Sequence, residues 1–202
     1  MPTPPRFEQG EHRVILASGS PRRRELCTAM GLTFTVKTSD VDETIPEGTW
    51  PCEAVEMLSR RKAEAVPSED AIVIAADTVV AIGDTILGKP QSERDARVML
   101  CMLSGRTHEV FTGVTVRYRG KCLTASAATS VLFRTLTDDE ITAYVATGEP
   151  MDKAGAYGIQ GLGALLVSGI EGDYFTIVGF PVCRVAEKLK NEFGIDCLKG
   201  TL

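Results

Sequence analysis

Three consecutive arginines follow a run of small residues in the segment SGSPRRR, which spans residues 18–24. The proline suits the first position of a helix and Ser20 suits the N-cap, so the arginines fall in the first turn. Unpaired N–H groups and the positive end of the helix dipole gather there, and arginines oppose that dipole, which favours a bound anion. The segment therefore predicts a phosphate site at the start of this helix. An ordinary capped helix with surface arginines would show the same pattern.

Two carboxylates could take part in acid–base chemistry at this site. Asp77 directly follows the apolar run AIVIAA, so we expect it at the mouth of a buried strand, where low dielectric and nearby cations perturb a carboxylate. Glu43, in the loop sequence VDET, is the second candidate. A turn aspartate that accepts backbone N–H groups and a solvated loop glutamate are the ordinary structural alternatives.

Two lysines are further candidate phosphate ligands. Lys62 lies in SRRKAEA, on an amphipathic helix where a lysine is usually solvated. Lys89 precedes a proline in LGKP, which holds its backbone extended and fixes its direction.

The glycine-rich stretch GAYGIQGLG, residues 155–163, invites a dinucleotide-binding interpretation. It precedes a predicted strand instead of following one, which excludes the Rossmann fingerprint, and no P-loop sequence occurs anywhere in the chain. Gln160 in this stretch offers an amide whose donor and acceptor suit the edge of a nucleobase. A glycine-rich turn without a ligand fits the spacing equally well.

The elements that must position these residues follow from apolar periodicity and from glycine and proline breaks. Strands are predicted at 13–17, 33–37, 71–76, 164–168 and 175–178, and helices at 21–30, 51–66, 92–102, 138–147 and 181–193. A hairpin is predicted at 107–134, and a tight turn at 83–84 is predicted to fold VVAI (79–82) back against TILG (85–88). This order predicts an α/β fold with a mixed twisted sheet flanked by helices. Ligands of open α/β sheets bind beyond the carboxyl ends of strands, where both the arginine segment and Asp77 are expected.

The chain has 202 residues, enough for one large domain or one domain of two lobes. Its 22 basic and 27 acidic residues give a net charge of −5, which disfavours binding to nucleic acid through broad phosphate neutralisation. Aromatic residues make up 6% and form no stacking series, so a single-stranded nucleic-acid binder is also disfavoured. A local cluster of cations in an acidic protein better suits a small polyanion.

Six cysteines lie without C-x-x-C spacing beside only two histidines, which indicates free thiols and no zinc site. No stretch has the length and apolar character of a signal peptide or a membrane span, so we expect a cytoplasmic protein with no membrane contact. Residues 1–12 are predicted to form a flexible tail, and residues 13–202 a single domain.

Six segments together resemble the Maf family of nucleoside triphosphate pyrophosphatases, over residues 13–193. They are LASGSPRRREL, SRRKAEA, AADTVV, LGKP, LSGRTHEVFTGV and GEPMDKAGAYGIQG. The resemblance implies a two-lobed α/β fold with a central cleft, related to that of inosine triphosphatases. It also implies hydrolysis of a nucleoside triphosphate between the α and β phosphates with a divalent metal, Mg²⁺ or Mn²⁺, in the cytoplasm and often as a homodimer.

The resemblance also assigns roles to residues. It implies catalytic roles for Asp77 as proton acceptor and for Lys62 and Lys89, metal ligation by Glu43 and Asp77, and substrate binding by Ser18, Arg22, Arg23, Thr78 and Gln160. The trio Arg22, Thr78 and Gln160 resembles the branch that acts on dTTP and UTP. A metal bound directly to Asp77 would make it a poor base, so base and ligand are both open roles. The alternative function is a nucleotide-binding regulator of cell division without catalysis, but such a module gains nothing from the acid pair unless a structural metal binds there.

Overall fold

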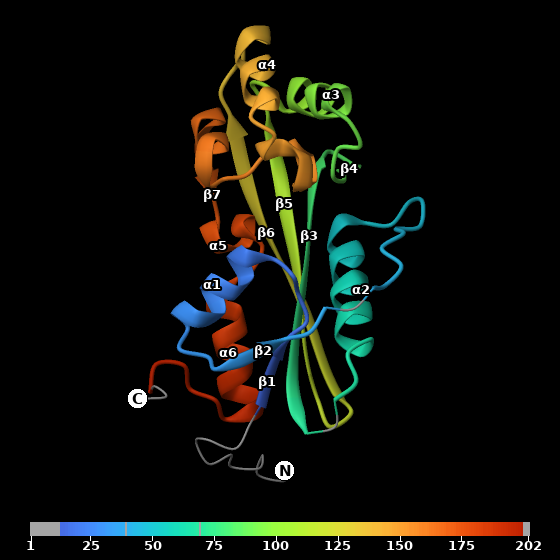
Figure 1. The fold of residues 1–202 in the computed structure, drawn as a ribbon, viewed down its shortest axis with the longest axis vertical. Coiled ribbons are helices and arrows are strands. Elements are labelled where there is room, and N and C mark those ends of the chain that lie inside the picture. The colour runs from blue at the N-terminus through green and yellow to red at the C-terminus, as the bar shows by residue number, and fades with distance from the viewer. Residues whose placement is uncertain (1–12, 39, 69, 200–202) are drawn as a thin grey trace.

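The computed structural model describes residues 13–38, 40–68 and 70–199. Within them, seven strands form one twisted sheet in the order β2-β1-β3-β5-β6-β7, and β4 pairs with β3 (Figure 1). β1 is parallel to β2 and to β3, and the other pairs are antiparallel, which confirms the predicted mixed sheet. The strands are β1 Arg13–Leu16, β2 Phe34–Val36, β3 Ala71–Ile82, β4 Thr85–Leu87, β5 Thr107–Tyr118, β6 Lys121–Phe133 and β7 Val167–Glu171.

Helices cover both faces of this sheet and one end of it. They are α1 Pro21–Ala29, α2 Pro51–Glu64, α3 Glu93–Leu103, α4 Asp138–Ala146, α5 Tyr174–Val178 and α6 Val182–Phe193, with 3₁₀ turns at Glu149–Asp152, Ala154–Ala156 and Gly161–Leu166. The helix starts follow local chemistry: Ser92 accepts a hydrogen bond from Asp95 N, and Thr137 and Glu140 form a reciprocal capping box. Both caps were predicted from the sequence.

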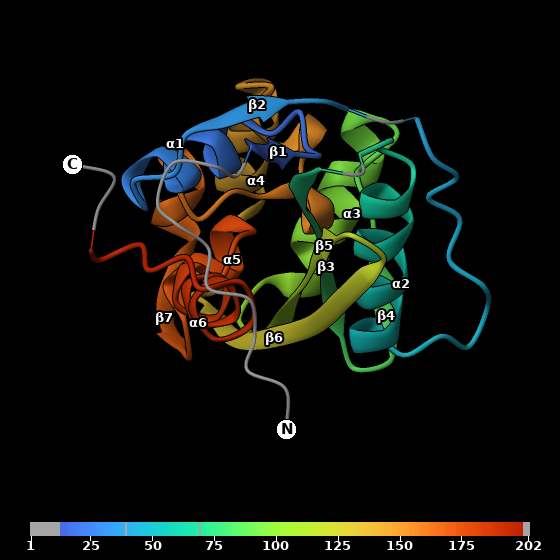
Figure 2. The ribbon, with the colours of Figure 1, turned by 90° about the horizontal axis from the view of Figure 1, so that it is seen from below.

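Successive residues of β3 point to opposite faces of the sheet, as in any strand. Ile72, Ile74 and Ala76 join the core beneath α1 and α6, whereas Val73 and Ala75 join the core beneath α2. Figure 2, seen along the long strands, places α2 on one side of them and α1 and α6 on the other. The strand β3 is therefore the wall between two helical layers.

Besides the core beneath α2, two larger hydrophobic cores give the molecule its two lobes. One core lies at the end covered by α3 and α4, with Leu100, Phe133 and Tyr144 among its buried residues. The other lies beneath α1 and α6, with Leu16 and Phe180 fully buried in it. The long strands β3, β5 and β6 connect both cores, so the predicted two-lobed fold is confirmed (Figure 1).

Two predicted strands near the C-terminal end were wrong. The segment predicted at 175–178 is the helix α5, because Asp173 accepts hydrogen bonds from Phe175 N and the Thr176 hydroxyl and Gly179 ends the helix in the left-handed conformation. The segment predicted at 164–168 is mostly a 3₁₀ turn, and β7 begins only at Val167. Local capping outweighed the β-branched composition that suggested a strand at α5.

The strand β3 runs without a break from Ala71 to Ile82, so it joins the strand predicted at 71–76 to the hairpin arm predicted at 79–82, and the predicted pairing of that arm with TILG is confirmed. Antiparallel pairing with β5 runs through Asp77, which lies opposite Gly113, and reaches Ala81 opposite Glu109. Asp77 therefore lies inside a strand and not at its mouth, which corrects the sequence interpretation.

All six cysteines are unpaired, as predicted. Among the residues that the structure describes, none of the helices is both long enough and apolar enough to cross a bilayer. The predicted tail at residues 1–12 lies outside the described residues.

Candidate active site

A break in strand pairing opens the sheet beside Asp77. On one edge of β3, β1 pairs as far as Ile74 and β4 pairs from Val80, so two short strands leave a stretch of the edge between them. The chain leaves β1 at this point and turns into the N-terminus of α1. The break is the counterpart of the crevice at which open α/β sheets bind ligands.

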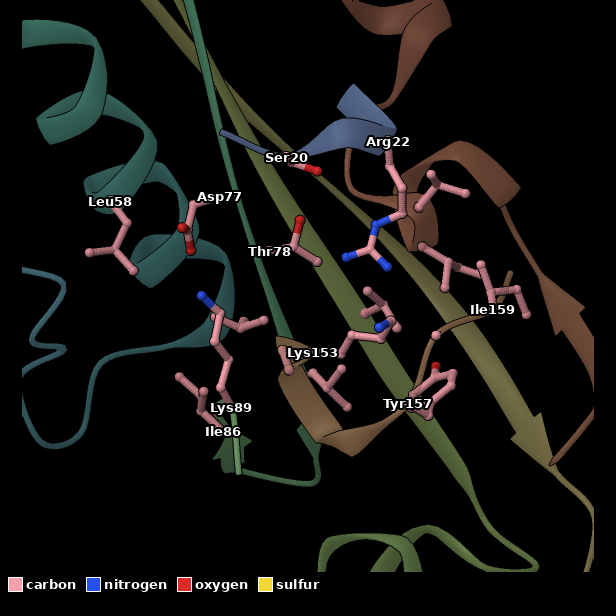
Figure 3. A pocket seen from close by; sticks show the side chains of 18 of the residues that line it. Ser20, Arg22, Leu58, Asp77, Thr78, Ile86, Lys89, Lys153, Tyr157 and Ile159 are labelled. Atoms are coloured by element: carbon pink, nitrogen blue, oxygen red, sulfur yellow. The ribbon is translucent and has the colours of Figure 1, made fainter. Parts of the chain in front are cut away.

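A cavity of about 420 Å³ fills this crevice between the lobes. Its lining includes the charged and amide side chains Arg22, Arg23, Glu43, Lys62, Asp77, Lys89, Gln91, Lys153 and Gln160. Every predicted site residue lines it except Ser18. Figure 3 shows Arg22 and Lys89 reaching into it from opposite sides, with Thr78 between them on the strand. The structure thus brings together residues that lie more than 130 positions apart in the sequence.

The two carboxylates converge on one lysine. Lys62 Nζ lies 2.5 Å from Asp77 Oδ1 and 2.8 Å from Glu43 Oε1. Asp77 points to the α2 face of the sheet because it follows Val73 and Ala75 at even spacing. Lys62 is not a solvated helix lysine, since its side chain is 14% exposed and points from α2 to the sheet.

The charge of Glu43 depends on the surrounding cations. Partial burial alone would raise the pKa of Glu43, but the hydrogen bond and the charge of Lys62 lower it below its ordinary value. The positive charges of Lys89 and Arg23 act in the same direction. Glu43 is therefore ionised at neutral pH and belongs electrostatically to the cavity.

Arg23 connects α1 to the opposite face of β3. Its Nη2 donates to Thr78 Oγ1 at 3.2 Å, its Nη1 donates to Ser18 Oγ at 3.0 Å and its Nε donates to Gly179 O at 2.8 Å. Burial lowers the pKa of Arg23, an effect that the nearby charge of Asp77 opposes. Ser18 is buried and lies outside the cavity lining, so its hydroxyl contacts Arg23 and does not face the cavity.

The N-terminus of α1 faces the cavity. Ser20 occupies the N-cap with Pro21 after it, as predicted, but its side chain makes no capping hydrogen bond and instead lines the cavity. Arg22 extends from the first turn into the same space (Figure 3). Unpaired N–H groups, the positive end of the helix dipole and an arginine here have the chemistry of an anion-binding site.

The other end of the cavity is apolar. Val110, Ile159, Ile177 and the ring of Tyr157 line this apolar wall, and Gln160 follows Ile159 in the chain. Ile86 also lines the cavity but lies beside Lys89 (Figure 3). Such a wall with one amide suits a flat, partly polar ring better than another phosphate.

Lys153 also lines the cavity, and the sequence interpretation did not single it out. Its side chain is 14% exposed and its Nζ donates to Glu149 O at 2.6 Å and to Asp152 Oδ1 at 2.5 Å. The sequence did offer a signal for Lys153, since it lies just before the glycine-rich stretch. The tight turns of that stretch fold back onto its side chain and so place it at the cavity.

Comparison with known proteins agrees with this geometry. The family model described as Maf-like protein matches residues 13–192. The chain belongs to the Maf-like family. It is 54% identical to the dTTP/UTP pyrophosphatase of Moorella thermoacetica over 188 residues, which are 91% of this chain and 96% of that protein. It is 47% identical to the dTTP/UTP pyrophosphatase of Bacillus cereus over 94% of this chain and 95% of that protein.

Two solved structures resemble this Maf-like chain more distantly. The match to the Staphylococcus aureus Ham1 protein covers 93% of this chain and 93% of that protein, with a TM-score of 0.46 and 14% identity. The HAM1 protein of Coxiella burnetii covers 60% of this chain and 73% of its own, with a TM-score of 0.42 and 16% identity. Both TM-scores lie below 0.5, so the family assignment depends on the sequence relationship.

Proposed function

We propose that this protein hydrolyses dTTP and UTP to the nucleoside monophosphate and pyrophosphate. The observation that carries the proposal is one cavity in which cations from separate elements, two convergent carboxylates and an apolar wall with an amide meet. The names of its Maf-like relatives, dTTP/UTP pyrophosphatase, support the choice of substrate.

The charges of the cavity suit a triphosphate. Arg22, Lys89 and the N-terminus of α1 would bind the phosphate oxygens, and their positive charge stabilises the negative charge that grows on the leaving pyrophosphate. In the proposed step, a water oxygen bonds to the α-phosphorus while the bond to the bridging oxygen breaks, and Asp77 takes the proton of that water. The pyrophosphate leaves with the electron pair of the broken bond.

The donor set at Asp77 and Glu43 fits a divalent cation. Both carboxylates already approach one cationic group, the ammonium of Lys62, and Mg²⁺ is typically held by one or two carboxylates together with substrate phosphates. Across residues 13–38, 40–68 and 70–199, no group of three or more His, Cys, Asp or Glu side chains could hold a metal. A bound Mg²⁺ or Mn²⁺ would supply Lewis-acid activation of the phosphate and of a water.

This donor set predicts that metal binding depends on nucleotide. Two carboxylates shared with Lys62 are a weak site alone, so we expect the affinity for Mn²⁺ to rise about 100-fold or more, by roughly 3 kcal/mol, when a non-hydrolysable dTTP analogue is present. Titration of Mn²⁺ with and without the analogue, followed by electron paramagnetic resonance, measures this. Equal affinity in both titrations would contradict a site that the substrate completes.

A non-catalytic nucleotide-binding regulator of cell division is the alternative. Such a regulator gains nothing from two acids paired with one lysine beside the cationic side chains that would bind phosphate. Location in the cytoplasm and assembly into a homodimer, which the family resemblance implied, stay predictions.

The test of the proposed function is a panel of canonical nucleoside triphosphates with Mg²⁺ or Mn²⁺, scored for pyrophosphate and for orthophosphate. We expect pyrophosphate and a monophosphate as primary products, with dTTP and UTP turned over faster than purine nucleotides. Orthophosphate with a nucleoside diphosphate would contradict cleavage between the α and β phosphates, and binding without turnover would favour the regulator.

The pyrimidine preference should depend on Gln160. Replacing Gln160 by Ala removes the amide next to the apolar wall, so we expect the ratio of kcat/KM for dTTP over GTP to fall by about tenfold or more. Turnover of dTTP itself should fall less. Gln91→Ala is the matched control, because Gln91 also lines the cavity but donates to Lys89 O, away from the apolar wall. A similar loss of discrimination in both variants would refute the assignment of Gln160 to the base.

A further inference from the structure

Glu149 lies outside the cavity lining, but its carboxylate is the hydrogen-bond acceptor for the segment that carries Gln160. Leu162 N donates to Oε2 at 3.0 Å, and Gly163 N donates to Oε1 at 3.0 Å. The Tyr144 hydroxyl donates to Oε1 at 2.9 Å. Partial burial would raise the pKa of Glu149, but these donors lower it below its ordinary value. An ionised carboxylate therefore accepts three hydrogen bonds here.

Tyr144 extends the same network to the start of the segment. Gly158 N donates to Tyr144 Oη at 3.3 Å, and burial raises the pKa of Tyr144, so the hydroxyl keeps the proton that it donates to Glu149. The two ends of the segment also touch, because a Cβ on Gly163 would lie 2.2 Å from Gly158 O. The backbone from 158 to 163 is thus a closed loop with α4 and Glu149 at its base.

Gln160 lies between these two anchors. It and Ile159 line the cavity, and the turn after them passes through Gly161 with φ at 76°. A Cβ on Gly161 would lie 2.8 Å from Glu149 Oε2, so the backbone directly after Gln160 packs against the carboxylate.

The backbone of Glu149 also orients Lys153. Glu149 O accepts a hydrogen bond from Lys153 Nζ, and the stem of Lys153 packs so closely on Gly158 that a Cβ there would lie 2.8 Å from Lys153 Cε. Figure 3 places Lys153 between Tyr157 and Arg22 in the cavity. Glu149 therefore contacts both Lys153 and the loop that carries Gln160, and both of these residues line the cavity.

We propose that Glu149 is a positioning residue that sets the place of Gln160 and so the preference of the cavity for a pyrimidine base. The inference rests on the proposed function. Loss of the carboxylate would leave the N–H groups of Leu162 and Gly163 without their acceptor, and water would compete for them as the loop opens. The chemistry at Asp77 lies across the cavity and keeps its own partners.

The test replaces Glu149 by Gln, which keeps the size of the side chain but offers one acceptor oxygen where the network uses two. We expect amide exchange of Leu162 and Gly163, resolved by NMR, to accelerate about tenfold or more. We expect KM for dTTP to rise about tenfold with kcat within about threefold, and the dTTP over GTP ratio of kcat/KM to fall. Unchanged exchange and an unchanged ratio would overturn the proposal.

Glu140→Gln is the matched control. Glu140 belongs to the same lobe and also loses one charge, but it caps α4 and pairs with Arg134, which donates to Leu165 O, beyond the segment 158–163. We expect a lower melting temperature with an unchanged dTTP over GTP ratio. A fall of that ratio in the control equal to that in Glu149→Gln would overturn the proposal, because general destabilisation would then explain both.

Tyr144→Phe keeps Glu149 and removes only the hydroxyl that connects it to Gly158. It should accelerate exchange of the Gly158 amide and weaken discrimination in the same direction, and normal exchange with normal discrimination would count against the network. Failure of the proposed function can be distinguished from failure of this proposal. A wild-type protein that does not hydrolyse dTTP would refute the proposed function. The amide exchange rates and the affinity for a non-hydrolysable dTTP analogue would still decide the role of Glu149.

Discussion

Replacing Asp77 by Asn is expected to lower kcat for dTTP by about 10² to 10⁴, the range typical of losing a general base. The fold should survive, because the amide keeps the size of the carboxylate and its oxygen can still accept the hydrogen bond of Lys62. The backbone of Asp77 also stays paired with Gly113. Melting temperature and turnover are measured on the same preparation.

Measuring nucleotide affinity in the Asp77→Asn variant separates the loss of a general base from the loss of a negative charge near the phosphates. The affinity for a non-hydrolysable dTTP analogue without metal should stay the same or rise, since a negative charge near the phosphates is lost. Asp42→Asn is the matched control, because Asp42 is an exposed acid next to Glu43 whose side chain accepts from Thr44 N. It should leave kcat within about twofold.

Two outcomes would contradict the role of Asp77. Near-normal kcat in Asp77→Asn would remove it from the mechanism, and a collapsed melting temperature would make it a structural residue of β3. If Asp77 serves mainly as a metal ligand, raising the Mn²⁺ concentration should recover part of the lost turnover. A base role predicts no such recovery.

Strong local signals in the sequence predicted most of the fold. The capping residues Ser92 and Thr137 and the turn at 83–84 fix element boundaries within a few positions, and the structure confirms them. The helix α5 was missed because its cap at Asp173 is a single residue, whereas the β-branched segment after it is typical of a strand. The continuity of β3 through Asp77 and Thr78 was missed because it depends on pairing with β5, which begins 25 residues after β3 ends.

The candidate site was predictable as a set of residues but not as a geometry. Alternation along β3 sends Asp77 to α2 and Thr78 to α1, which the sequence implies only once the strand is known to continue. The pairing of Lys62 with both acids and the contacts of Arg23 with Ser18 and Thr78 depend on how the helices pack on opposite faces. No short-range pattern encodes such contacts.

The position of Lys62 depends on how closely α2 approaches the sheet, and Gly113 permits that approach. A Cβ on Gly113 would lie 2.3 Å from Val55 O and 2.4 Å from Val55 C, in the backbone of α2. Lys62 lies two turns further along the same helix, and Asp77 is the register partner of Gly113. Any residue larger than glycine must therefore move the helix that carries the lysine.

Replacing Gly113 by Ala is expected to destabilise the protein by about 3 kcal/mol and to lower its melting temperature by roughly 6–12 °C, because the clash is with backbone atoms. Gly169→Ala is the matched control, since Gly169 also lies in a strand but a Cβ there meets nothing within 4 Å. Moving α2 should also lengthen the contact of Lys62 with Asp77, so kcat of the folded variant should fall about 10- to 100-fold. A Gly113→Ala protein with normal stability and turnover would show that α2 shifts freely and that the close packing of α2 on β5 does not position the candidate active site.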